Sequence, residues 1–117
     1  MEKLFDSELK LMEIIWQNER ISAKELSLLA AEQLGWNKNT TYTVIKRLID
    51  KGALQREDPG FHCVALIKKE HLQKTETTTL IQKLFAGSKK AFFAALVDEE
   101  LSPEDLAALK ELIEKQG

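Results

Sequence analysis

The sequence has few of the groups that disulfides, membrane spans and secretion signals require. It holds one cysteine in 117 residues, Cys63, so an internal disulfide bond is impossible. Proteins without disulfides are typical of a reducing cytoplasm, which is the location we predict. No apolar run approaches the roughly 20 residues of a membrane-spanning helix. Charges interrupt the stretch from Met1 to Arg20, so we expect neither a signal peptide nor membrane insertion.

Groups for metal binding and catalysis are also scarce. The two histidines and Cys63 do not combine with neighbouring acids at a spacing typical of zinc ligands. His62 and His71 stand in no Ser/His/Asp or Cys/His pattern that would mark a nucleophile. We therefore predict no metal, no cofactor and no enzymatic activity.

Positive charge is not in excess, since 17 Lys and Arg oppose 19 Asp and Glu for a formal net charge of −2. This balance excludes binding by bulk positive charge, so any nucleic-acid contact needs a local basic patch. Such a patch lies between Trp36 and Lys51, where four cations stand against one anion, a local balance of +3.

Two helices are predicted before this patch. Apolar residues at helical spacing predict a helix from about Ser7 to Gln17, capped by Asp6. The capping box Ser22-Ala23-Lys24-Glu25 begins a second helix. Ile21 before it either staples the helix entry or starts a very short strand. Gly35 is expected to end the second helix in a left-handed conformation.

A third helix is predicted between an Asn37 cap and Gly52. Its apolar stripe consists of Thr41, Val44, Ile45, Leu48 and Ile49. The outer face holds residue types suited to DNA: short threonines for phosphates or base edges, an asparagine for adenine, and cations for phosphate or guanine. These residues are Asn39, Thr40, Thr43, Lys46 and Arg47.

A hairpin follows, with strands predicted at residues 53–57 and 61–67 and a turn at Asp58-Pro59-Gly60. Three helices and a two-stranded wing form a winged helix-turn-helix, whose second paired helix enters the major groove. The acidic tip around Glu57 and Asp58 argues against wing contacts with phosphates. Further helices are predicted at residues 68–86, at 89–97 and from Ser102 onward, so the fold class is mainly α with a small β-hairpin wing.

The stretch from Trp36 to Leu54 resembles the BlaI/MecI/CopY family of bacterial repressors, the penicillinase repressors. Three further segments resemble the same family: Glu8-Leu9 through Ile14-Ile15-Trp16, Leu84-Phe85-Ala86-Gly87-Ser88, and Leu101-Ser102-Pro103-Glu104-Asp105-Leu106. The resemblance implies a winged-helix DNA-binding domain over 1–68 and a helical dimerisation domain over 69–117. It also implies a homodimer that binds the two halves of a palindromic operator in double-stranded DNA.

Residue roles follow from the same resemblance. The DNA-facing positions are Asn39, Thr40, Tyr42, Thr43, Lys46 and Arg47. The dimer interface is Leu80, Leu84, Phe85, Phe92, Phe93, Leu96, Leu106, Leu109 and Ile113. The family implies repression of resistance genes of the beta-lactam type, relieved when a membrane sensor protease system leads to proteolysis of the repressor. By position, that cut maps to Ala95-Leu96.

Three departures leave alternatives open. Family members often carry Pro and Lys where Lys38 and Asn39 stand, so the base preference there is open. The Asn-Phe pair of the family's cut is absent from Ala95-Leu96, so release by another signal or a different cut is also open. The copper-responsive branch carries paired Cys-x-Cys motifs that this chain lacks, and we expect Cys63 to be a small buried hydrophobe. A regulator of another regulon, including a metal-responsive one, and a winged-helix protein-interaction module are the competing functions.

Overall fold

The structure is a computed structural model that describes residues 3–99 and 101–116. It divides into two compact units, Met1–Leu72 and Gln73–Gly117, called here the N-terminal and the C-terminal unit. The helices are α1 (Asp6–Asn18), α2 (Ala23–Leu34), α3 (Lys38–Asp50), α4 (Lys69–Phe85), α5 (Lys89–Asp98) and α6 (Pro103–Gln116). The strands are β1 (Arg20–Ser22), β2 (Leu54–Glu57) and β3 (His62–Ala65).

Four of the predicted local signals for helix ends are confirmed, at Ser22, Asn37, Gly35 and Ser102. Ser22 Oγ accepts the Glu25 N–H at 3.1 Å, and Asn37 Oδ1 accepts the Thr40 N–H at 2.8 Å. Gly35 has φ +70° and closes α2 through its N–H. The Ser102 cap likewise accepts the Asp105 N–H at 3.0 Å, directly before α6.

The start of α1 differs from the prediction. Its N-cap is Phe5, and Asp6 is the first helical residue rather than the cap. The Phe5 N–H donates to the buried Glu8 carboxylate at 2.7 Å. The Glu8 carboxylate therefore binds the N–H of the N-cap residue, which is a different contact from the first-turn N–H that the Asp6 side chain was expected to accept, and the helix begins one residue earlier.

The sheet has three strands instead of the two of a simple hairpin. Its order is β1-β3-β2 and both pairings are antiparallel, with Ile21 opposite Cys63 and Cys63 opposite Arg56. Of the two roles left open for Ile21, the structure gives it the strand. β3 begins one residue later than predicted, because Phe61 has φ +47°, a left-handed conformation that extended backbone does not adopt. It ends at Ala65, two residues before the predicted end.

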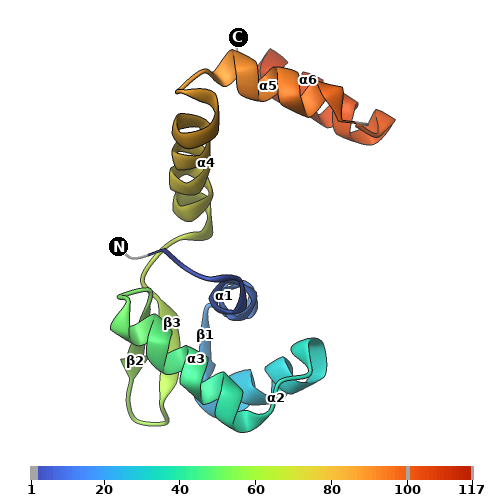
Figure 1. Cartoon of the computed structure of the whole chain (residues 1–117). Coiled ribbons are helices and arrows are strands. Elements are labelled where there is room, and N and C mark those ends of the chain that lie inside the picture. Colours follow the sequence, from blue (N-terminus) through green and yellow to red (C-terminus); the bar gives the residue numbers. More distant parts are fainter. Residues whose placement is uncertain (1–2, 100, 117) are drawn as a thin grey trace. The chain divides into compact units, whose positions relative to one another are not determined.

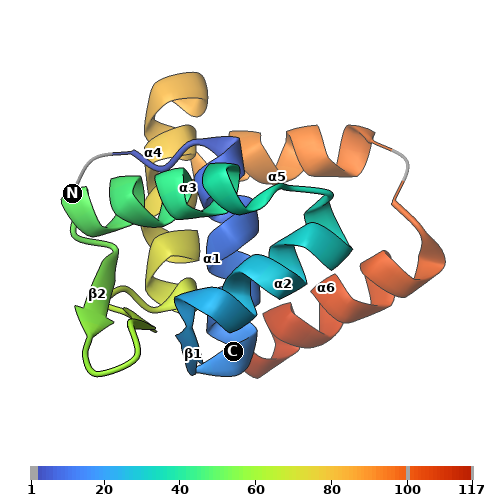
Figure 2. The same cartoon turned by 90° about the horizontal axis from the view of Figure 1, so that it is seen from below.

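The core of the N-terminal unit lies between its three helices and the sheet. α1, α2 and α3 contact one another, and α3 also contacts β2 (Figure 1). In the view of Figure 2, α3 crosses in front of α1. Cys63 is 1% exposed in this core, which confirms its expected role as a buried hydrophobe. Leu72, from the first turn of α4, is also a core residue. The N-terminal unit therefore includes the start of α4.

The C-terminal unit contains α5, α6 and most of α4, and it leaves much apolar surface uncovered. Phe85 and Phe92 meet edge to face at 5.6 Å between ring centroids. Many large apolar side chains are nevertheless exposed by 40% or more: Leu80, Leu84, Phe93, Val97, Leu106, Leu112 and Ile113. In the described part of the chain, no helix combines the length and apolar character that crossing a membrane would take.

Candidate nucleic-acid interface

α3 presents one face to the core and the other to solvent. Four of the five residues predicted to line its apolar stripe are buried: Thr41, Val44, Ile45 and Leu48. Because successive helical residues turn by about 100°, burial of this stripe forces the opposite face outward. That face holds the predicted DNA-facing residues Asn39, Thr40, Thr43, Lys46 and Arg47, which are all exposed, while Tyr42 beside them is half-buried. The six therefore lie together on one side of one helix.

Two of the three threonines on α3 donate their hydroxyl protons to backbone carbonyls of the preceding turn. The Thr43 hydroxyl donates to the Asn39 carbonyl at 2.9 Å, and the Thr41 hydroxyl donates to the Asn37 carbonyl at 3.2 Å. With its proton engaged, the exposed Thr43 offers an acceptor oxygen and a methyl group. Such a side chain suits a base amino group or a thymine methyl better than a phosphate oxygen.

The N-terminus of α3 adds partial positive charge to this face. Asn37 caps one backbone N–H, that of Thr40. The N–H groups of the first turn have no acceptor within the helix, and the helix dipole makes this end positive. With Lys38 exposed beside it, this end of α3 has the features of an anion-binding helix terminus.

One of the four cations counted in the sequence is not part of this face. Lys51 Nζ lies 2.6 Å from Glu8 Oε1, donates to the Lys3 carbonyl at 2.9 Å and is 4.1 Å from the centroid of the Phe5 ring. The side chains of Lys51 and Glu8 are 11% and 0% exposed. The exposed charges of α3 are therefore three cations and one anion, a balance of +2 instead of +3.

The Glu8 carboxyl is charged despite its burial. Burial raises its pKa, but the hydrogen bonds from Lys51 and the Phe5 N–H, together with the charges of Lys51 and Arg47, outweigh that effect. The net result is a pKa below the usual range for glutamate. The pair thus joins α1 to the C-terminal end of α3, the helix that carries the predicted DNA-facing residues.

The acidic wing tip is neutralised by neighbouring arginines. Arg56 Nε lies 3.1 Å from Asp58 Oδ2, and Arg20 Nη1 lies 3.5 Å from Glu57 Oε1. Asp58 Oδ1 also accepts the Phe61 N–H at 3.2 Å. Each acid of the wing tip therefore has an arginine beside it. Arg56 was not singled out from the sequence. Its place two residues after the apolar Leu54 was the available signal, because residues i and i+2 of a strand point to the same face.

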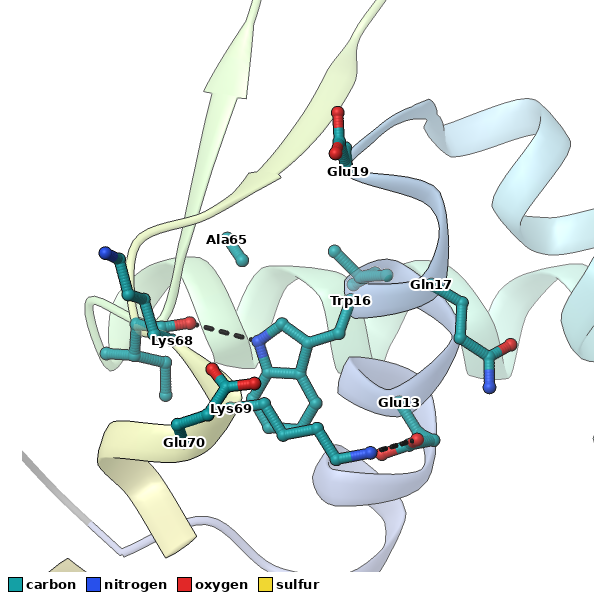
Figure 3. A pocket seen from close by; sticks show the side chains of 10 residues that line it. Glu13, Trp16, Gln17, Glu19, Ala65, Lys68, Lys69 and Glu70 are labelled. Carbon is teal, nitrogen blue, oxygen red and sulfur yellow. Dashed lines mark hydrogen bonds and ion pairs between the residues drawn. The ribbon is translucent and has the colours of Figure 1, made fainter. Parts of the chain in front are cut away.

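A cavity lies where α1, β3 and the start of α4 meet. This cavity of about 500 Å³ is lined by Trp16, Ala65 and Ile67 and by charged residues of both signs (Figure 3). The Trp16 indole N–H donates to the Ile67 carbonyl at 3.0 Å, and Lys69 Nζ lies 2.6 Å from Glu13 Oε1. These contacts attach the first turn of α4 to α1. The site combines no nucleophile, base and acid in a catalytic arrangement.

Residues 3–99 and 101–116 include possible metal ligands and the single thiol of the chain, Cys63. No group of three or more His, Cys, Asp or Glu side chains in this part of the chain is arranged to hold a metal ion. Burial raises the pKa of the Cys63 thiol to about 11, against a small lowering effect of the Arg56 charge. A thiol with that pKa is protonated at neutral pH and is a poor ligand and nucleophile.

Comparisons with known proteins give the family of this chain. The model of the family described as penicillinase repressor matches residues 4–115. An uncharacterised protein of Latilactobacillus sakei is 30% identical over 92% of this chain and 75% of its own length. The penicillinase repressor of Bacillus licheniformis is 23% identical over 97% of this chain and 91% of its own length. The methicillin resistance regulatory protein MecI of Mammaliicoccus sciuri is 24% identical over 97% and 95%.

Among solved structures, the N-terminal part resembles the solution structure of the DNA-binding domain of the repressor BlaI. The TM-score is 0.54 at 31% sequence identity, covering 59% of this chain and 90% of that domain. The predicted fold class, mainly α with a winged helix-turn-helix, is thereby confirmed.

Proposed function

Because this chain belongs to the penicillinase repressor family, we propose that it represses transcription as a homodimer bound to a palindromic operator. Members of this family are DNA-binding transcriptional repressors and are not enzymes, as the sequence predicts for this chain. The proposal concerns the finer points: the symmetry of the complex, the residues that contact DNA, the regulated genes and the mechanism of release.

The exposed polar face of α3 is the observation that carries the proposal. In a winged helix-turn-helix the second paired helix lies in the major groove with its N-terminal half toward the bases. Here that half carries Asn39, Thr40 and Thr43, and Lys46 and Arg47 follow one turn later. A winged helix used for protein interaction would need an apolar outer face instead. We assign base contacts to Asn39 and Thr43 and phosphate or guanine contacts to Lys46 and Arg47.

The homodimer is supported by the apolar surface of the C-terminal unit. Of the nine predicted interface residues, five are exposed by 40% or more: Leu80, Leu84, Phe93, Leu106 and Ile113. The other four are half-buried: Phe85, Phe92, Leu96 and Leu109. Exposed apolar area of this extent on a small domain indicates an interaction surface. A second copy would cover it and give the complex the two-fold symmetry of a palindrome.

In vitro selection tests the proposed operator. The full-length chain is incubated with a pool of random DNA duplexes, and the bound duplexes are sequenced and then footprinted. We expect an inverted repeat whose half-sites are centred about 10 base pairs, or a multiple of that, apart. Enrichment of an unrepeated site, or of no sequence at all, would overturn the proposal.

For the regulated genes, we propose beta-lactam resistance. The support is the similarity to the penicillinase repressor of B. licheniformis and to MecI. The selected operator should then occur upstream of a beta-lactamase or a membrane sensor gene in the source genome. Its occurrence only upstream of unrelated genes would contradict this assignment and favour another regulon.

The release step has two competing forms. The first is cleavage at Ala95-Leu96 by a membrane sensor protease system. Both residues are half-buried in α5, and a cut there would separate α6 from the rest of the dimerisation region. Each DNA-binding unit would then bind one half-site alone and lose the gain from bivalent binding. The second form is a signal that leaves the chain intact. Mass spectrometry of the repressor after induction decides between them: intact protein during derepression excludes cleavage.

A further inference from the structure

The register of the small sheet places Arg56 on its helix-facing side. Ile21, Cys63 and Arg56 are aligned across the three strands in one row. Since Ile21 and Cys63 are buried in the core, Arg56 projects from the same face of the sheet. Arg20 pairs with Val64 in the next row, so it projects from the opposite face. Arg56 of β2 and Arg20 of β1 therefore lie on different sides of the sheet.

Two aromatic rings in contact, each with one cation against it, link α3 to β2. Lys38 Nζ lies 5.8 Å from the centroid of the Tyr42 ring. The Tyr42 and Phe61 rings meet edge to face, with centroids 6.0 Å apart and planes at 78°. The guanidinium carbon of Arg56 lies 3.7 Å from the centroid of the Phe61 ring. We call Lys38, Tyr42, Phe61 and Arg56 the helix–wing ladder; it joins the start of α3 to the wing through ring and cation–π contacts.

Phe61 is the fixed member of the ladder. Its φ of +47° is strained for a residue with a side chain, and such conformations persist only where the surroundings hold them. Here the Phe61 N–H donates to Asp58 Oδ1 at 3.2 Å, and its carbonyl accepts the Ala23 N–H at 2.8 Å. The turn of the wing and the start of α2 thus hold the backbone on both sides of the ring.

Arg56 is oriented for anion binding by the same turn. Its Nε donates to both oxygens of Asp58, at 3.1 and 3.3 Å, while the ring of Phe61 covers the guanidinium plane. The Nη1 and Nη2 groups carry four further N–H donors, in the fork geometry that matches a phosphate. The Arg56 side chain is 50% exposed. It therefore combines a fixed plane with access from solvent.

We propose that Arg56 binds a phosphate of the DNA backbone beside the groove that α3 occupies, and that Phe61 and Tyr42 are positioning residues that set its distance from α3. This inference rests on the proposed function, because it places α3 in the major groove. It gives the ring of Tyr42, half-buried against Phe61, the role of a spacer. It also gives Asp58 a role at the tip: this acid orients the arginine that contacts DNA.

The salt dependence of DNA binding tests Arg56. Binding of the full-length chain to the selected operator duplex is measured by fluorescence anisotropy between about 50 and 200 mM NaCl. Each protein–phosphate ion pair contributes about 0.9 to the slope of log K against log salt concentration. We expect Arg56→Gln to reduce the slope by about 0.9 for every Arg56 in the complex and to weaken binding several-fold. Arg20→Gln is the matched control, because it removes the same charge from the opposite face of the sheet.

Two further variants test the positioning role. Tyr42→Leu removes the ring edge that meets Phe61, so we expect it to weaken operator binding, and to weaken the Phe61→Leu variant by much less than it weakens the unmodified chain. Phe61→Leu keeps apolar volume and removes the ring face. We expect Phe61→Leu to weaken binding about as much as Arg56→Gln, and to add less than twofold when combined with it, because both act through one contact. Thermal unfolding of each variant separates loss of binding from loss of folding.

Failure of the Arg56 contact can be told apart from failure of the proposed repressor function. If the unmodified chain selects no operator, the proposed function fails first. If it selects one, and Arg56→Gln leaves the slope equal to that of Arg20→Gln, the phosphate contact is wrong. If Phe61→Leu weakens the Arg56→Gln variant as much as the unmodified chain, or Tyr42→Leu weakens the Phe61→Leu variant as much as the unmodified chain, the positioning role is wrong.

Discussion

Lys51 Nζ lies 2.6 Å from Glu8 Oε1 and joins the C-cap of α3 to the first turn of α1, across 43 positions of sequence. Glu8 is fully buried, and within the described residues its Oε2 has no hydrogen-bond partner. The pair therefore joins α3, the helix that carries the predicted DNA-facing residues, to α1 in the core.

Replacement of Lys51 by methionine should be strongly destabilising. The Glu8 carboxylate would stay buried without its cation, and breaking such a pair typically lowers the free energy of unfolding by about 3–5 kcal/mol. Urea denaturation followed by circular dichroism measures the change. The double variant Glu8→Met with Lys51→Met removes both charges and should recover much of the loss. If the single variant is as stable as the unmodified chain, the pair contributes nothing.

The same pair predicts a dependence of stability on pH. The pKa of Glu8 is lower in the folded chain than in the unfolded chain, so the folded state favours the charged carboxylate. Its contribution is complete above the unfolded pKa of about 4.3 and is lost as the pH falls through the lower folded pKa. Urea denaturation at a series of acidic pH values should show this loss. The chain with methionine at both positions should show a smaller loss over the same range.

Substitutions on the outer face of α3 should reduce operator binding without unfolding the protein. Arg47→Ala removes an exposed cation, and we expect about 1–3 kcal/mol weaker binding if it reads a base, or a smaller salt slope if it contacts a phosphate. Thr43→Ala removes the methyl and acceptor oxygen described above. Lys24→Ala, an exposed cation on α2, is the control. Unchanged operator binding in the combined Arg47→Ala, Thr43→Ala chain would disprove the assignment.

Removal of the C-terminal helices should leave a monomeric DNA-binding unit. Truncation after Lys69 removes Leu72, which is 7% exposed in the core of the N-terminal unit, whereas truncation after Lys74 retains it. We expect both fragments to bind the operator much more weakly than the full chain. The shorter one should be less stable by about 2 kcal/mol, the value of one buried leucine. Sedimentation and urea denaturation measure both effects; a monomeric full-length chain at micromolar concentration would contradict the dimer.

Cys63 should be unreactive until the protein unfolds. The thiol is buried, and its pKa of about 11 leaves almost no thiolate at neutral pH. We expect slow labelling by a thiol reagent in buffer and rapid labelling in urea. Cys63→Ser should lower the free energy of unfolding by about 1–3 kcal/mol, because the hydroxyl would lie buried in an apolar core. Rapid labelling of the native chain would show that this core opens readily.

The features that were predicted correctly from the sequence depend on residues no more than four positions apart. The caps at Ser22 and Asn37, the left-handed Gly35 and the two faces of α3 are local consequences of residue type and helical spacing. The helix ends and the exposed DNA-facing residues could therefore be placed from the sequence alone.

What it missed depends on contacts between distant segments. The ion pair of Glu8 could not be found from the sequence, because its partner Lys51 lies 43 positions further along the chain. β1 could not be assigned, since three residues form a strand only when β3 is beside them. The neutralised wing tip was missed for the same reason: the contact of Arg20 with Glu57 is set by the order of the strands.

The anchored indole of Trp16 gives the protein an intrinsic optical reporter. Trp16 lies beside the start of α4, whereas Trp36, the second of the two tryptophans in the sequence, lies in the connection before α3. Replacing either by phenylalanine leaves one emitter at one location. Emission from Trp36 would respond to DNA at the start of α3, and emission from Trp16 would respond to loss of its bond to Ile67. Operator binding and disturbance of the α4 attachment would thus be followed separately, in real time and without an added dye.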